Sequence, residues 1–410
     1  MDLDKRAKEY LVQIENEVTD FLVNLMSIRS YPNEELEACE YCYQKFNEIK
    51  GVKVEKVMID NSIKNHPLHC ASWLDYLDYT GHYNIEVTWP GTGEEKPLYM
   101  NAHIDTVAAF AESLLPPQVK DGIVYGIGAC DDKGSIASIY TVFRLLEKFQ
   151  IKTPFDVIGH IVVEEEIGGN GALAITDCPM EGQAAVNLGP STGAIFPAAR
   201  GAMMLQLKAT AKSKKMTPGA AMTDNAFFLV KKAAEVILEE HKKYCEECLA
   251  VPTKYYEGYR PASAFGMVHG GNAPDMLPGT AIGRVTITFV PNITAAELKG
   301  RMNAALGAVP ELRDTVDVEY IFERDNAVEE FDHPFVLEFQ KCAKANGFRA
   351  DLEAMLSCCD KYFYQNVHDI PTVVFGPGRL MDAHNLSEQV PMKEVLNCGK
   401  TIFDWVISKS

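Results

Sequence analysis

The spacing of apolar residues predicts alternating strands and helices at the two ends of the chain. Apolar side chains recur at helical spacing from Leu11 to Leu25, and a second helix is expected over 34–49. Gly134 opens a further helix with one apolar face. Short apolar runs bounded by turn residues predict strands at 51–59, 84–87, 97–103, 156–163 and 372–378. Strands that alternate with helices indicate an α/β fold, with a mainly parallel sheet covered by helices on both faces.

The middle of the chain has a different pattern. The elements expected there are a strand at 200–211, a helix at 224–249, strands at 262–269 and 280–290, a helix at 294–306 and a strand at 315–323. This β-α-β-β-α-β order is typical of a ferredoxin-like α+β sandwich, which is a self-contained unit. We therefore predict a discontinuous larger domain of residues 1–198 and 324–410, with a second domain of residues 199–323 inserted into it.

Length, composition and charge narrow the class of protein. A chain of 410 residues is expected to form two domains, and 47% hydrophobic with 23% charged residues is typical of a globular protein. The net charge of −18 argues against a nucleic-acid partner, since binding phosphate requires clustered lysine and arginine. Neither an apolar run long enough to span a membrane nor a secretory signal is recognised, so we expect a cytoplasmic protein with no membrane partner.

The cysteines are expected to be reduced thiols, since no signal for an oxidising compartment is present. Two CxxC pairs, Cys39/Cys42 and Cys245/Cys248, leave a structural zinc site open as an alternative. Both pairs lie in helical patterns and in different predicted domains, which argues against a shared ion.

Four short segments rich in acidic residues and histidine follow one another along the chain. They are MNAHID (100–105), GIGACDDKG (126–134), VVEEEIGG (162–169) and GPGRLMDAHNLSE (376–388). Each alone has an ordinary explanation, such as a strand-end histidine, a helix-capping aspartate or a solvated acidic loop. Ligands collect beyond the carboxyl ends of parallel strands, so together the segments predict a metal site that activates water for attack on a carbonyl.

The residue types indicate which role each residue would have in the metal site. His103 and Asp105 share one face of a strand, so the carboxylate can orient the imidazole of a metal-binding histidine. The carboxylate of Asp131 is suited to bridging two cations. Among the three glutamates at 164–166, one would bind metal and its neighbour would carry the proton. The glycine-permitted turn at 376–378 would bring His384 back over the sheet edge.

In this combination the segments resemble the zinc-dependent exopeptidase and deacylase family. It includes acetylornithine deacetylase, succinyl-diaminopimelate desuccinylase, aminoacylase, carnosinase-type dipeptidases and the glutamate carboxypeptidases. The resemblance extends over nearly the whole chain and includes Asn84 and Asp360. It implies a catalytic α/β domain, a ferredoxin-like lid that often mediates dimerisation, and hydrolysis of an amide in a substrate with a free carboxylate.

The resemblance also implies a role for each matching residue. His103 would be a ligand of one metal ion with Asp105 as its supporting carboxylate, and Asp131 would bridge the ions. Glu165 would be the general base, while Glu166 and His384 would bind the other ion. The implied cofactor is zinc, as one or two ions, with manganese or cobalt as alternatives.

One departure from the family concerns the metal ligands. The family has an acidic ligand further along the chain, where this sequence has Gly189-Pro190. Either Asn187 or Glu164 replaces that ligand, or one ion binds weakly, or the enzyme uses a single ion.

Two departures concern the inserted domain. The family histidine in the first lid loop is absent, and the cationic alternatives are Lys214, Lys215 and His269. The family arginine on a later lid strand is replaced by Thr288, with Arg284 on the same strand. Lys215, His269 and Arg284 are thus candidate substrate-binding residues.

The sequence predicts a cytoplasmic metal-dependent amidohydrolase that cleaves a small N-acyl amino acid and forms a homodimer through its inserted domain. A dipeptidase or carboxypeptidase of the same family is the enzymatic alternative. A non-catalytic relative used for binding or assembly is the alternative from another class.

Overall fold

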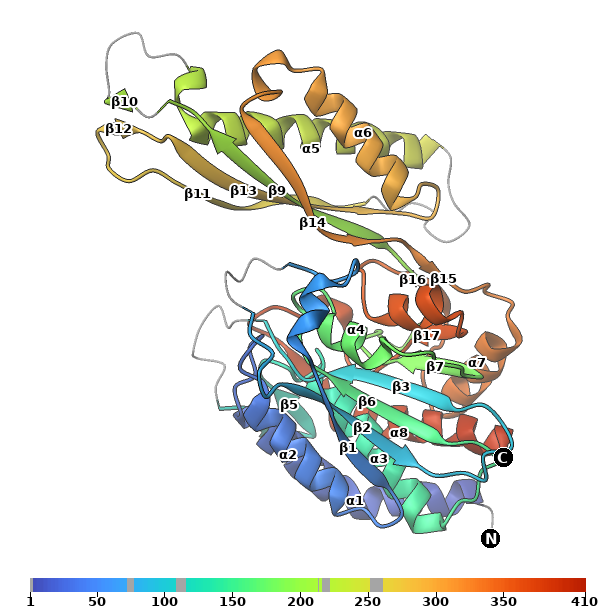
Figure 1. The fold of residues 1–410 in the computed structure, drawn as a ribbon. Coiled ribbons are helices and arrows are strands. Elements are labelled where there is room, and N and C mark those ends of the chain that lie inside the picture. Colours follow the sequence, from blue (N-terminus) through green and yellow to red (C-terminus); the bar gives the residue numbers. More distant parts are fainter. Residues whose placement is uncertain (1–2, 72–76, 108–115, 213, 216–221, 251–260) are drawn as a thin grey trace.

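A nine-stranded sheet organises the larger part of the computed structural model, which describes residues 3–71, 77–107, 116–212, 214–215, 222–250 and 261–410. The strand order is β1-β2-β6-β3-β7-β17-β8-β15, with β16 beside β8 (Figure 1). The bounds are β1 Lys53–Met58, β2 Tyr83–Trp89, β3 Leu98–His103, β6 Val157–Val162, β7 Ala184–Asn187, β8 Ile195–Ala199, β15 Ala327–Val328, β16 Leu352–Met355 and β17 Thr372–Val374.

The four central strands, β6, β3, β7 and β17, run parallel to one another. β1 and β2 extend the sheet antiparallel on one side, and β8 and β15 do so on the other. The predicted parallel sheet is therefore confirmed at the centre, where both faces are covered. Because these strands are parallel, their carboxyl ends all meet at one edge.

Helices cover both faces of this sheet, as predicted (Figure 1). α1 (Leu3–Ser27), α2 (Leu36–Asn47), α3 (Lys133–Phe149) and α8 (Met392–Lys409) lie on one face, and α7 (Pro334–Ala345) packs beside α8. α4 (Asn170–Thr176) and the π-helix Phe363–Val367 lie on the other. Among the described residues, no helix has the length and apolar character needed to cross a membrane. A small sheet, β18-β5-β4, joins Gln389–Pro391, Ile123–Tyr125 and Gln118–Lys120.

The chain leaves the large sheet after β8 and builds a second, four-stranded antiparallel sheet. Its order is β11-β13-β9-β14, with bounds Ser263–Gly270, Thr280–Phe289, Gly201–Thr210 and Val316–Arg324. α5 (Ala226–Ala250) and α6 (Ala295–Gly307) pack on one face, and the strands β10 (Lys214–Lys215) and β12 (Met276–Leu277) pair at one end. This is the order of the predicted ferredoxin-like sandwich. We call it the lid; the exact domain boundaries, 198/199 and 323/324, stay a prediction.

The lid has its own hydrophobic core, since apolar residues alternate along its strands. On β13, Val285 and Ile287 face α5 and α6 and are fully buried, whereas Arg284 and Thr286 point to the opposite face. Cys245 and Cys248 belong to this core, while Cys39 and Cys42 belong to the core of the large sheet. The two CxxC pairs thus lie apart, as the sequence indicated.

Candidate active site

Four parallel strands deliver the predicted residues to one edge of the large sheet. His103 is the last residue of β3 and pairs with Val162, the last residue of β6. The three glutamates at 164–166 follow directly after β6, and Asn187 ends β7 beside them. The predicted strand-end placement is therefore confirmed for the first and third segments.

His103 is held between two aspartates. Its Nε2 lies 3.1 Å from Asp131 Oδ1, and its Nδ1 lies 3.3 Å from Asp105 Oδ1. Asp105 is fully buried and also accepts hydrogen bonds from the backbone N–H groups of Glu165 (3.1 Å) and Glu166 (2.9 Å). One carboxylate thus orients the imidazole and fixes the start of the glutamate loop, which is how a supporting residue positions a metal ligand.

His384 closes the other side of the site. Its Nε2 lies 3.2 Å from Asp131 Oδ2 and 3.1 Å from Glu166 Oε1. Those two contacts raise the pKa of His384 to about 11. Its side chain is 47% exposed, so this ligand candidate lies at the mouth of the site. The two oxygens of Asp131 face different histidines, which is the arrangement expected of a bridging carboxylate.

Glu165 lies next to His103, Asp131 and His384, and its carboxylate oxygens are not engaged by other described residues. Within the described ranges its side chain forms no hydrogen bond or ion pair, although its backbone is tied to Asp105. Burial is the largest cause that raises the pKa of Glu165 well above its ordinary value, and the nearby Asp360 and Glu166 add to it. A half-buried carboxylate with a raised pKa and free oxygens is suited to proton transfer.

Two further buried carboxylates support residues of the site, and neither was among the predicted site residues. Glu388 is buried, and its Oε1 accepts hydrogen bonds from the N–H groups of Cys130 and Asp131, each at 3.1 Å. Asp132 is fully buried and accepts from the N–H of His103 at 3.2 Å. The signal for Glu388 was its place at the end of the segment that contains His384.

The donor set fits a divalent cation. Ligand atoms of His103, Asp131 and Glu166 all lie within 4.8 Å of one another. Ligands at the usual zinc distance of about 2.0–2.2 Å are at most about 4.4 Å apart, so little movement would bring these atoms onto one ion. Imidazole with carboxylate is a donor set that zinc, manganese and cobalt accept.

The site opens into a cavity of about 370 Å³ between the large sheet and the lid. The large sheet supplies His103, Asp131, Glu165, Glu166 and His384, and Asp360 lies among them. The lid contributes Met204, Thr286, Phe322 and Arg324. A cavity of this size suits a small molecule.

Asn187 and Glu164 are the candidates to replace the missing acidic metal ligand, and the structure places them in different surroundings. Asn187 lines the cavity, but its Oδ1 accepts a hydrogen bond from Asn101 Nδ2 at 3.0 Å. Glu164 does not reach the cavity lining; its Oε2 accepts from Tyr79 (2.8 Å) and from Asn170 (3.2 Å). At Gly189, which does line the cavity, an added Cβ would meet only Val374 Cγ1, at 3.9 Å.

Asp360 is a further acid in the lining of this cavity, which Gly189 also lines. It is 2% exposed, lines the cavity, and accepts a hydrogen bond from Asn101 Nδ2 at 3.2 Å. Burial raises its pKa to about 6. In the sequence, Asp360 is part of the family resemblance, but no role in the site was predicted for it.

The lid candidates lie outside the cavity lining. His269 is exposed on β11, an edge strand, and Lys215 is exposed on β10. Arg284 lies two residues before the cavity residue Thr286 on β13, and its Nε donates a hydrogen bond to Gln206 Oε1 at 2.8 Å. The side chain of Lys214, and residues 213 and 216–221 of the same loop, lie outside the described part of the chain.

The comparison with protein families shows to which family the chain belongs. The model of peptidase family M20/M25/M40 matches residues 99–408, which is more than half of the chain. The chain belongs to this family. It is accordingly a hydrolase of amide or peptide bonds, with the metal-binding character of that family.

Individual relatives of this M20 family member are distant. It is 24% identical, over 80% of its length and 84% of the other chain, to the N-formyl-4-amino-5-aminomethyl-2-methylpyrimidine deformylase of Bacillus subtilis. It is 26% identical to the acetylornithine deacetylase of Shigella sonnei, over 65% of its own length and 67% of that protein. The dipeptidase Dug1p of Saccharomyces cerevisiae shares the fold, with a TM-score of 0.76 at 14% identity, covering 98% of this chain and 97% of that one.

Proposed function

We propose that this M20 family member is a metal-dependent amidohydrolase that removes the acyl group from a small N-acyl amino acid. The observation that supports the proposal most directly is the convergence of four ligand candidates around the Glu165 carboxylate, which forms no hydrogen bond or ion pair with the described residues. His103, Asp131, Glu166 and His384 supply the donors, and Glu165 faces the same small cavity. Two curated relatives that cleave acyl groups from nitrogen agree with this reaction class.

The cofactor that we propose is zinc, as one or two ions, with manganese or cobalt as alternatives. When bound, a divalent cation supplies Lewis-acid polarisation of the amide carbonyl and lowers the pKa of water. Asp131, Glu166 and His384 would hold one ion, and His103, oriented by Asp105, would hold the other together with Asp131.

The chain's own catalytic contribution is the transfer of a proton by Glu165. Its carboxylate would accept a proton from water as the water oxygen attacks the carbonyl carbon. The same proton would then pass to the amide nitrogen as the C–N bond breaks, so the amine leaves neutral and the carboxylate is regenerated. Asp105 fixes the backbone of Glu165, which keeps this base at the edge of the cavity.

A dipeptidase or carboxypeptidase remains the second candidate, since either would cleave the same kind of bond in a cavity of this size. A substrate panel of N-acetyl amino acids and matched dipeptides, assayed with zinc-, manganese- and cobalt-loaded protein, separates the two. Turnover of the N-acetyl series by at least tenfold in kcat/KM over the dipeptides supports the deacylase. The reverse preference would replace it with the peptidase, and turnover of neither series by metal-loaded protein would contradict both.

We further propose that the chain forms a homodimer through the lid and acts in the cytoplasm. The lid carries several large apolar side chains that are at least a third exposed, namely Phe227, Phe228, Val268, Met276 and Ile282. β11 also ends the order of the lid sheet, so its outer edge can pair with another strand. Light scattering coupled to size exclusion tests the dimer, and a monomeric mass at micromolar concentration would contradict it.

A further inference from the structure

Two adjacent cysteines, Cys358 and Cys359, line the cavity of the candidate active site. They follow β16 in the segment that leads to Asp360, and both are partly exposed free thiols. They are the only two consecutive cysteines in the sequence. Neither has a part in the proposed hydrolysis, and no role was predicted for either from the sequence.

The backbone is fixed on both sides of the pair. The carbonyl of Ser357 accepts a hydrogen bond from the N–H of Arg200 at 3.2 Å, and the carbonyl of Cys359 accepts one from the N–H of Tyr362 at 3.3 Å. No side chain of the described residues forms a hydrogen bond with either thiol. Consecutive Cα atoms are about 3.8 Å apart across a trans peptide, so one atom in the cavity can bond to both sulfurs after side-chain rotation alone.

Both thiols are protonated at neutral pH. Burial raises the pKa of Cys358 to about 12, although the nearby Arg324 lowers it, and burial raises the pKa of Cys359 well above its usual value. Alkylation and oxidation of a single thiol proceed through the thiolate, so both reactions should be slow here. A reagent that bonds to both sulfurs and carries away both protons is favoured instead, because its second bond forms within one complex.

The donor atoms narrow the ligand to soft, thiophilic centres. The thioethers of Met204 and Met355 line the same cavity as the two thiols, so four sulfur-bearing side chains surround it. Thiol and thioether sulfur prefers soft centres, whereas the imidazole and carboxylate donors of the candidate metal site suit zinc, manganese or cobalt. The cavity therefore contains two donor sets with different preferences.

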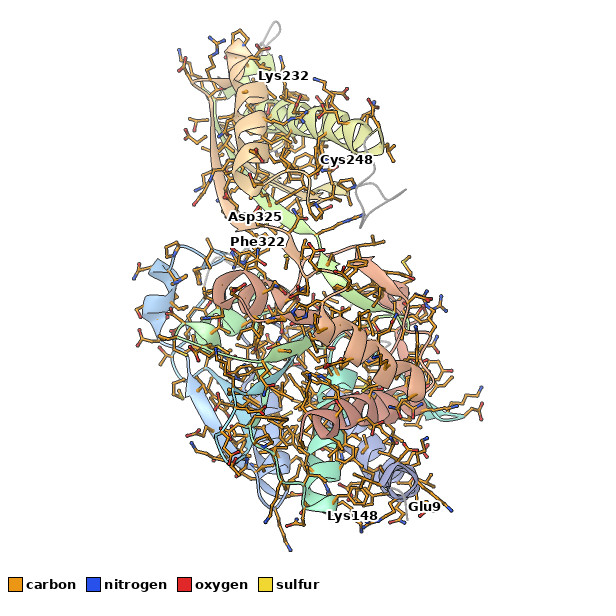
Figure 2. The ribbon with its side chains drawn as sticks, turned by 90° about the vertical axis from the view of Figure 1, so that its right-hand side faces the viewer. Glu9, Lys148, Lys232, Cys248, Phe322 and Asp325 are labelled. Carbon is orange, nitrogen blue, oxygen red and sulfur yellow. The ribbon has the colours of Figure 1, made fainter. Side chains whose placement is uncertain are left out.

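The other closely spaced cysteines lie away from the cavity. They are buried in the two hydrophobic cores, as the pairs Cys39/Cys42 and Cys245/Cys248. Figure 2 shows Cys248 within the lid, whereas Phe322, which lines the cavity, lies where the lid meets the large sheet. A small reagent added to the folded protein therefore reaches the pair at 358–359 before either of these pairs.

We propose that Cys358 and Cys359 form a dithiol site that binds one soft, thiophilic centre of the class of trivalent arsenicals, and that its occupation excludes substrate from the cavity. With an arsenic(III) oxide, two As–S bonds form while both S–H bonds and the bonding between arsenic and oxygen break. The oxygen leaves as water with the two thiol protons. Arsenic stays trivalent, so no oxidant or reductant is required. The site goes beyond the proposed function, and only its effect on turnover rests on that function.

The first test adds one equivalent of phenylarsine oxide to zinc-loaded full-length protein, after removal of excess zinc, and measures the intact mass without denaturant. We expect one phenylarsenic unit per chain with the loss of two thiol hydrogens. Cys358→Ser and Cys359→Ser should each abolish this adduct. The matched control is Cys178→Ser, which removes an exposed cysteine outside the cavity lining and should bind as the wild type does.

Fragmentation of the wild-type adduct gives a measurement that needs no variant, and it should place the arsenic on residues 358 and 359. An adduct on any other pair of cysteines overturns the proposal, and so does a wild type that forms no adduct. An adduct that persists in both serine variants overturns it as well.

Turnover of N-acetyl-L-leucine by the same preparations tests whether the dithiol lies where substrate binds. One equivalent of phenylarsine oxide should lower kcat/KM of the wild type by about tenfold or more, and should leave that of Cys358→Ser nearly unchanged relative to the untreated variant. An adduct at 358–359 with unchanged kcat/KM overturns the proposed exclusion of substrate. If the adduct forms at this pair but the untreated protein hydrolyses no amide, the proposed function fails and the dithiol site stands.

Discussion

The two walls of the cavity are built on different principles. On the large-sheet wall, supporting carboxylates hold the ligand segments: Asp105 supports the backbone of Glu165 and Glu166, Asp132 supports His103, and Glu388 supports Asp131. On the lid wall, Met204, Thr286 and Phe322 present mainly apolar surface, and Arg324 is the charged group among them. The first wall holds its polar side chains by hydrogen bonds and is suited to chemistry. The second wall is suited to substrate selection.

This difference separates the effects of substitution. A change on the large-sheet wall should reduce kcat or metal affinity for every substrate, because it alters the groups that act on the amide. A change on the lid wall should alter KM and the preference between substrates. A family can keep one reaction and vary its substrates when the two tasks lie on different elements.

The sharpest test of the large-sheet wall is Glu165→Ala. Removal of the general base should lower kcat by about 10²- to 10⁴-fold while the bound metal stays nearly unchanged, because Glu165 is not a predicted ligand. Steady-state kinetics and elemental analysis of the same preparation measure both quantities. Loss of metal in this variant would mean that the roles of Glu165 and Glu166 are reversed.

The support of His103 can be broken without removing a ligand. Asp105→Asn keeps the shape of the side chain but not the charge that faces His103 Nδ1 and the N–H groups of Glu165 and Glu166. Metal affinity or kcat should fall about ten- to a hundredfold. Competition with a chelator measures the affinity, and circular dichroism checks that the fold is kept. An unchanged affinity together with an unchanged kcat would show that the loop is positioned by other contacts.

Sequence patterns predicted the placement of those residues of the large-sheet wall that directly follow strand ends. His103 and the glutamate loop sit at the ends of β3 and β6, and parallel strands bring such ends together whatever the details of the loops. The lid topology was equally predictable, since the alternation of strands and helices specifies one sandwich.

The lid wall could not be predicted in the same way. Arg324 is buried because Leu68 and Gly168, far away in the sequence, pack against it. Arg284 lies on the same face of β13 as Thr286, but the two-residue period cannot show how far along the strand the cavity extends. Whether a polar residue on the cavity-facing side of the lid sheet reaches the site depends on how the lid is placed against the large sheet. Local sequence patterns do not contain that information.

The large-sheet wall has one incomplete position, and Gly189→Asp should complete it. An added Cβ has room there, and a carboxylate on it would give the His103 side of the site a ligand of its own. We expect affinity for a second metal ion to rise by about tenfold or more, an effect comparable to that of other changes around a metal site. Calorimetric titration with zinc measures it, and Gly189→Asn is the matched neutral control. Equal affinity in the two variants would indicate that Asn187 or Asp360 already completes the site.

The smallest expected effect belongs to the apolar part of the lid wall. Met204 lies on the open face of the lid sheet and is not part of the lid core, so Met204→Ala should remove contact with the substrate and little stability. Loss of a few buried carbon contacts should raise KM for N-acetyl-L-leucine about fivefold at nearly unchanged kcat. Met276→Ala is the control, because this lid methionine is 45% exposed and does not line the cavity. A fall in kcat without a change in KM would show that the lid wall acts on the chemistry, and that the division between the two walls is wrong.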